Sequence, residues 1–110
     1  DIVQDVQRIV QQRLHEDLSL SQLSSTVHLH PKYLSWLYKQ ETGEGISEYV
    51  YRLKMEKAAE WLKYSHKKVY EIACHLGYRN TSYFIRVFKE KYKMTPNQFR
   101  LQHGTFRHSG

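Results

Sequence analysis

Cysteine, proline and glycine are scarce in this chain, and it has no long apolar run. Its 110 residues include one cysteine, two prolines and five glycines. The single cysteine, Cys74, excludes an internal disulfide framework, and no stretch approaches the roughly 18 consecutive apolar residues of a membrane-spanning helix. The opening residues DIVQDVQRIV also lack the apolar region of a signal peptide. These absences predict a soluble, cytoplasmic protein without a membrane partner.

Basic residues outnumber acidic ones. The chain has 17 Lys and Arg against 11 Asp and Glu, which gives a formal net charge of +6 and a pI near 9.5. This surplus favours an anionic partner such as nucleic acid or an acidic membrane, although it carries no information about the fold. With 40% hydrophobic residues, the chain can form one ordinary domain, or two very small ones that share an element. It begins with Asp1 rather than methionine, and we expect it to be part of a longer protein.

Apolar residues recur at helical spacing almost everywhere, and no segment alternates with a period of two. The predicted fold class is therefore all-α. Apolar residues from Ile2 to Leu14 mark a first amphipathic helix, Ser19 and Gln22 form a capping box for the second, and Gly77 is a natural end for a later one. The helices after the first are expected over residues 19–27, 30–42, 46–64, 69–76, 81–92 and 95–103.

An internal repeat organises these helices. At an offset of about 50 residues, the apolar positions of one part of the chain match those of another. The matched pairs are Leu20 with Val69, Leu23 with Ile72, Val27 with Leu76, Leu34 with Phe84, Leu37 with Val87, and Tyr38 with Phe88. Each copy is a short helix, a tight turn and a longer helix, which is a helix-turn-helix unit. We therefore expect a single DNA-binding domain over 1–110, with units at 15–43 and 69–93, a linker helix at 46–64 and a C-terminal helix at 95–103.

The longer helix of each copy has two different sides on a helical wheel. Its apolar side carries the aromatic and aliphatic anchors that hold it to the domain. The opposite side carries Lys32, Ser35, Trp36 and Lys39 in the first copy, and Ser82, Ile85, Arg86 and Lys89 in the second. A helix that reads the major groove of double-stranded DNA needs this division. A merely solvated surface has no reason to recur in register, so the repeat favours two recognition helices.

Basic charge is concentrated in the second copy. Residues 79–93, RNTSYFIRVFKEKYK, hold five basic side chains and one acidic one, whereas residues 30–41 hold two and one. We therefore expect the second copy to contribute more of the salt-dependent affinity. The start of the helix near Thr81 adds a partial positive charge and free N–H groups. The predicted phosphate contacts are Lys39, Arg79, Asn80 and Lys89.

The linker helix suggests how two recognition helices could bind one duplex. At about 1.5 Å per residue it is about 28 Å long, close to the ~34 Å of one DNA turn. This length predicts that both recognition helices enter successive major grooves on one face of bent DNA.

Two segments carry a family resemblance: LSLSQLSSTVHLHPKYLSWLYKQETG, and IACHLGYRNTSYFIRVFKEKYKMTPNQFR. The chain resembles the DNA-binding domain of the AraC/XylS family of bacterial transcription regulators, and in particular the subgroup fused to response-regulator receiver domains. The resemblance implies seven helices, RNA polymerase as a further partner, and a receiver or sensor domain elsewhere in the protein, as in two-component systems. It also implies a place at the bacterial nucleoid. The base contacts that it implies are Lys32, Ser35 and Trp36 in the first unit, and Thr81, Ser82, Ile85 and Arg86 in the second.

Two positions depart from the family pattern. Trp36 stands where members often have arginine, so the bidentate reading of guanine is lost there. Its indole is expected either to pack on a sugar or thymine methyl, or to lean onto the neighbouring helix. Lys54 stands where arginine is usual, which puts a bidentate salt bridge at that position in doubt.

Signals for other chemistry are weak. The seven histidines include only one close pair, His28 and His30, without a second cluster at zinc spacing. Cys74 lies in a short apolar helix, where we expect a small buried residue rather than a reactive thiol. No phosphate-binding glycine loop or nucleophile elbow is found, so no cofactor, no metal and no enzyme activity are predicted. Two alternatives remain open: a basic helical module that binds an acidic partner, and the DNA-targeting unit of a repair enzyme.

Overall fold

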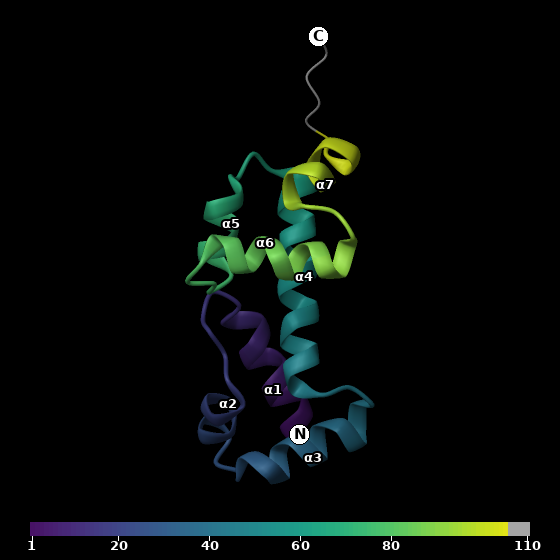
Figure 1. The fold of residues 1–110 in the computed structure, drawn as a ribbon. Helices are drawn as coiled ribbons and strands as arrows, with labels where there is room; N and C mark the ends of the chain where they lie inside the picture. Colours follow the sequence, from purple (N-terminus) through teal and green to yellow (C-terminus); the bar gives the residue numbers. More distant parts are fainter. Residues whose placement is uncertain (106–110) are drawn as a thin grey trace. The chain divides into compact units, whose positions relative to one another are not determined.

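The computed structural model describes residues 1–105, which form seven α-helices and no strand (Figure 1). The all-α, seven-helix prediction is therefore confirmed for this part of the chain. The chain divides into two compact units, Asp1–Leu53 and Lys54 onwards, and the helix α4 contributes residues to both. The helices are α1 (Ile2–Gln12), α2 (Leu20–Thr26), α3 (Pro31–Thr42), α4 (Ile46–Tyr64), α5 (Val69–His75), α6 (Thr81–Tyr92) and α7 (Pro96–His103).

Side-chain caps define where several helices begin. The Ser19 hydroxyl accepts a hydrogen bond from the Gln22 N–H at 3.1 Å, and the Gln22 side chain accepts one from the Ser19 N–H at 3.0 Å. This is the predicted capping box of α2. His30 caps α3 as predicted, because its Nδ1 accepts from the Lys32 N–H at 3.1 Å. These caps depend on neighbours in sequence, which is why sequence alone could place them.

The first unit has a core built from α1, α2, α3 and the start of α4. Leu34 and Tyr38 of α3 are fully buried, whereas Leu37 is half-buried. The Tyr38 hydroxyl accepts a hydrogen bond from the Gln7 amide at 3.5 Å, and burial raises the pKa of this phenol. The buried residues of this core are Val3, Val6, Val10, Leu23, Leu34, Tyr38, Ile46, Tyr49 and Val50. One side of α3 is thereby held, and its other side is left outward.

A bidentate ion pair joins α4 to the turn that precedes it. The Arg52 guanidinium donates to both carboxylate oxygens of Glu44, each at 3.0 Å. These hydrogen bonds lower the pKa of the Glu44 carboxyl. The pair fixes the chain between Gly43, which ends α3 with φ 79°, and the first turns of α4.

The second unit has an aromatic core. Phe84 and Phe88 of α6 are fully buried, and the Phe88 ring meets Phe99 of α7 edge-on, with centroids 5.4 Å apart. Tyr92 stacks at 4.6 Å from Phe88, and its hydroxyl donates to the Met55 carbonyl of α4 at 3.2 Å. The predicted role of Phe84 and Phe88 as anchors of their helix is confirmed.

Two buried cations tie helix ends together in the second unit. Lys54 is only 6% exposed, and its ammonium donates to the carbonyl of Leu76 just after α5. Arg100 of α7 donates to the carbonyls of Leu62 at 3.1 Å and Lys67 at 2.6 Å, beside the end of α4. Burial lowers the pKa of the Arg100 guanidinium. Both side chains satisfy carbonyls that a helix end leaves without intrahelical partners.

Candidate nucleic-acid interface

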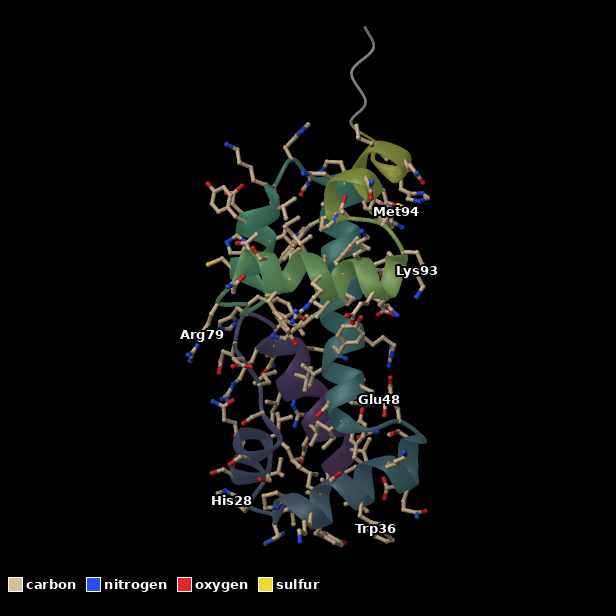
Figure 2. The ribbon with its side chains drawn as sticks, viewed as in Figure 1. His28, Trp36, Glu48, Arg79, Lys93 and Met94 are labelled. Atoms are coloured by element: carbon tan, nitrogen blue, oxygen red, sulfur yellow. The ribbon has the colours of Figure 1, made fainter. Side chains whose placement is uncertain are left out.

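The outward side of α3 carries the side chains that the sequence predicts. Lys32, Ser35, Trp36 and Lys39 are all exposed, and the Trp36 side chain is 57% exposed. Figure 2 shows Trp36 projecting away from the body of the first unit. One of the two expectations for Trp36 is therefore correct: the indole faces outward rather than leaning onto a neighbouring helix.

The outward side of α6 is similar but not identical. Ser82, Arg86 and Lys89 are exposed, while Thr81 and Ile85 are half-buried. Every predicted base-facing position of α6 thus keeps some access to solvent. Ile85 in particular can offer only part of its side chain to a base.

Arg79 and Asn80 precede α6 and are both exposed. Arg79 extends away from the turn in Figure 2. The Asn80 carbonyl oxygen accepts from the Tyr83 N–H at 3.0 Å, so this side chain caps the helix. A phosphate contact from Asn80 would then have to use its amide nitrogen, which remains a donor.

Two tyrosines at matching positions belong to these outward sides, and the sequence analysis did not include them. Tyr33 of α3 and Tyr83 of α6 are 50% and 48% exposed. The Tyr33 ring stacks on Trp36 with centroids 6.0 Å apart and planes at 27°. The Arg86 guanidinium lies 5.1 Å from the centroid of the Tyr83 ring. In both helices a tyrosine therefore supports the side chain three residues further on, and the repeat offset contained this signal.

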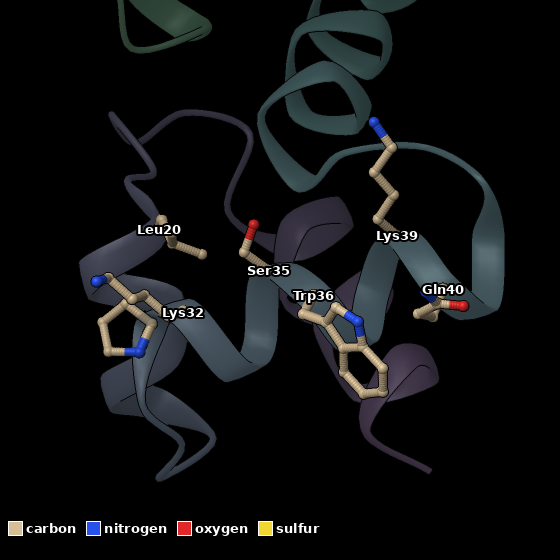
Figure 3. Close-up of a pocket in the computed structure, with 7 residues that line it drawn as sticks. Leu20, Lys32, Ser35, Trp36, Lys39 and Gln40 are labelled. Atoms are coloured by element: carbon tan, nitrogen blue, oxygen red, sulfur yellow. The ribbon is translucent and has the colours of Figure 1, made fainter.

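A cleft lies beside Trp36 in the first unit (Figure 3). Its volume is ≈ 490 Å³. Leu20, at the start of α2, points toward α3 and closes one side. The other residues that line it include Lys32, Ser35, Trp36, Lys39 and Gln40. It is therefore a largely apolar hollow with basic groups at its border.

One prediction about Cys74 is wrong, because its side chain is exposed rather than buried. The buried side of α5 is formed by Ile72, Ala73 and Leu76, and Cys74 falls off that side. Its partner in the repeat, Ser25, is exposed in the same way. A seven-residue helix has room for only one buried stripe, and hydrophobicity of its sequence does not say which residues occupy it.

Other kinds of site are not found in residues 1–105. No group of three or more His, Cys, Asp and Glu residues in this range could hold a metal ion. No helix in the range has both the length and the apolar character needed to cross a membrane. The outward sides of α3 and α6 are thus the sites to compare with known proteins.

Residues 23–102 match a family of helix-turn-helix domains. The chain belongs to the AraC/XylS family of transcription regulators. Within this family it corresponds to the DNA-binding domain, as the resemblance implied. The chain is similar to the regulatory protein PocR of Salmonella typhimurium, with 39% identity over 95 residues that cover 86% of this chain and 31% of PocR. It therefore spans about a third of that relative's length.

Solved AraC/XylS structures have the same fold. The C-terminal domain of AraT, a response regulator from Geobacillus stearothermophilus, superposes with a TM-score of 0.92 at 31% identity and covers 99% of this chain and 91% of that one. The C-terminal domain of the two-component response regulator yesN from Fusobacterium nucleatum gives a TM-score of 0.85 at 35% identity, covering 88% and 95%. Both relatives are parts of response regulators that were solved as separate domains.

Proposed function

We propose that this DNA-binding domain reads specific sequences with two helices, α3 and α6, which enter successive major grooves of one duplex. The observation that supports this most is the recurrence of one design. Each helix buries an aromatic or aliphatic side and exposes a polar and basic side, and a tyrosine supports the side chain three residues on. The proposed base-facing residues are Lys32, Ser35 and Trp36 in α3, and Thr81, Ser82, Ile85 and Arg86 in α6.

Arg86 is the strongest candidate for direct base reading. A guanidinium can donate two hydrogen bonds to O6 and N7 of guanine, which is the commonest specific contact in the major groove. The Tyr83 ring, 5.1 Å away, restricts where that guanidinium points. Ser82 can pair with several bases, and the half-exposed Ile85 can touch a thymine methyl. We therefore expect α6 to select a guanine.

Phosphate contacts are assigned to Lys39, Arg79, Asn80 and Lys89. All four side chains are exposed, and they lie on or just before the two recognition helices. Contacts of this kind position a protein on DNA and make affinity depend on salt, without reading sequence. Because more basic residues surround α6, we expect the second unit to supply more of this salt-dependent affinity.

We extend the proposal to the whole protein, of which this chain is a part. The names of its relatives describe regulators, and two of them are response regulators. A receiver or sensor domain elsewhere in the protein would then control this domain, as in a two-component system, and RNA polymerase would be a further partner. Such a protein works at the nucleoid in the bacterial cytoplasm and needs no catalytic group.

Fluorescence anisotropy on this chain tests the proposal. Duplexes selected from a randomised library are compared with scrambled duplexes, each titrated over a range of salt concentrations. We expect a preference of at least ~10³ for selected sites and a negative slope of log affinity against log salt. Arg86→Ala should reduce the preference, whereas Arg8→Ala on α1 removes the same charge and should leave it intact. Salt-sensitive binding without sequence preference would contradict the proposal.

A further inference from the structure

The cleft beside Trp36 differs from the equivalent surface of α6 in its chemistry. Where α6 places Arg86, α3 places an indole, and the cleft next to that indole is closed by Leu20. An indole has one N–H donor and no acceptor, so it cannot form the paired hydrogen bonds that read guanine. The first unit therefore needs a different feature of the base pair to read.

Trp36 is held in place before any ligand arrives. Its ring stacks on Tyr33 with centroids 6.0 Å apart, and both rings are exposed to at least half their area. Two exposed aromatic side chains that support each other form a fixed apolar wall, and little side-chain entropy is lost when a partner binds. Isolated on a soluble domain, such a wall together with Leu20 indicates a contact surface for an apolar group.

The major groove offers one exposed apolar group, the 5-methyl of thymine. Lys32 and Lys39 line the same cleft, so a ligand that carries negative charge around an apolar group suits it electrostatically. Ser35 adds a hydroxyl that can donate to the thymine O4. With a volume of ≈ 490 Å³, the open cleft has room for the edge of a base pair rather than a methyl group alone.

From these features we infer that the first unit selects thymine, whose 5-methyl group enters the cleft between Leu20 and Trp36. This inference rests on the proposed DNA-binding function and names the base that the first unit reads. The two units then differ in their preferred base pairs: α3 reads a methyl group, and α6 reads the hydrogen-bonding edge of guanine.

A methyl-deletion scan tests the inference. In a duplex selected for high affinity to this chain, each thymine is replaced in turn by deoxyuridine, which removes only the 5-methyl and keeps base pairing. At one or two positions we expect affinity to fall about 4-fold, which corresponds to ~0.8 kcal/mol for one buried methyl-sized group. The same scan with Trp36→Ala should show less than about a 2-fold effect at those positions, since distant sites add within that margin.

Two further variants define the outcome. Leu20→Ala should also reduce the deoxyuridine effect, whereas Ile85→Ala in α6 should leave it at about 4-fold at the same positions. Circular dichroism checks that each variant is folded. A deoxyuridine effect that persists in Trp36→Ala, or a duplex in which no thymine responds, would overturn the inference and leave sequence-specific binding standing. Failure of the proposed function would show earlier, as no preference for the selected duplex.

Discussion

His28 and Gly77 occupy the same place in the two helix-turn-helix units, and both have a left-handed backbone, with φ of 60° and 80°. The surrounding hydrogen bonds also match. The Leu29 N–H donates to the Ser24 carbonyl at 2.9 Å, and the Tyr78 N–H donates to the Ala73 carbonyl at the same distance. The turn between the two helices is therefore conserved within the repeat, although only the second unit has the residue that adopts this conformation without strain.

His28→Gly is expected to stabilise the first unit. A left-handed backbone costs a residue with a Cβ atom about 1–2 kcal/mol, part of which is offset because glycine makes the unfolded chain more flexible. We expect a net gain of about 0.5–1 kcal/mol in the free energy of unfolding, measured by urea denaturation. Gly77→Ala is the reciprocal change and should lower stability. An unchanged or lower urea midpoint for His28→Gly would show that the turn is not strained.

Tyr83→Ala is expected to weaken the reading of guanine by Arg86. The loss of a cation–π contact at an exposed site is worth roughly 0.5–1 kcal/mol, or about 2- to 5-fold in affinity for a selected duplex. Tyr83→Phe keeps the ring and is the matched control. Replacing a selected guanine by 7-deazaguanine removes N7, and its effect should shrink in Tyr83→Ala but not in Tyr83→Phe. Equal behaviour of the two variants would argue against a positioning role for the ring.

Lys89→Ala is expected to change the salt dependence of DNA binding more than Lys39→Ala does. Loss of one phosphate contact reduces the slope of log affinity against log salt by about 0.9. We expect a reduction of about that size for Lys89→Ala and a smaller one for Lys39→Ala, because basic charge is concentrated around α6. Titrations at four or more salt concentrations measure both slopes. Equal reductions would contradict the unequal division of charge between the units.

Arg100→Lys is expected to destabilise the second unit despite keeping the charge. Arg100 donates to several carbonyls at and beyond the end of α4, including those of Leu62 and Lys67. An ammonium on a shorter stem cannot reproduce this fork, and the loss of charge-assisted hydrogen bonds to buried carbonyls should cost about 2 kcal/mol. Urea denaturation measures the difference. Arg8→Lys, on the exposed side of α1, is the control and should change the midpoint little.

Local patterns in the sequence were sufficient for much of the fold and for the recognition sides. The spacing of Leu34 and Tyr38, and of Phe84 and Phe88, identified the buried sides of α3 and α6 because a helix of constant pitch places such residues on one stripe. Caps such as that of Ser19 were predictable because both partners lie within one helical turn. The repeat then distinguished a reading surface from an ordinary solvated one.

Tertiary structure decided what depends on distant partners or on the choice between equivalent local arrangements. Lys54 meets the Leu76 carbonyl 22 residues away, and no local pattern announces that contact. Cys74 is exposed because packing selects one stripe of a short helix. The position of Trp36 depends on the Tyr33 ring beneath it and on the cleft that Leu20 closes. Periodicity is a property of neighbours along the chain, whereas burial, stacking and clefts depend on which surfaces the folded chain brings together.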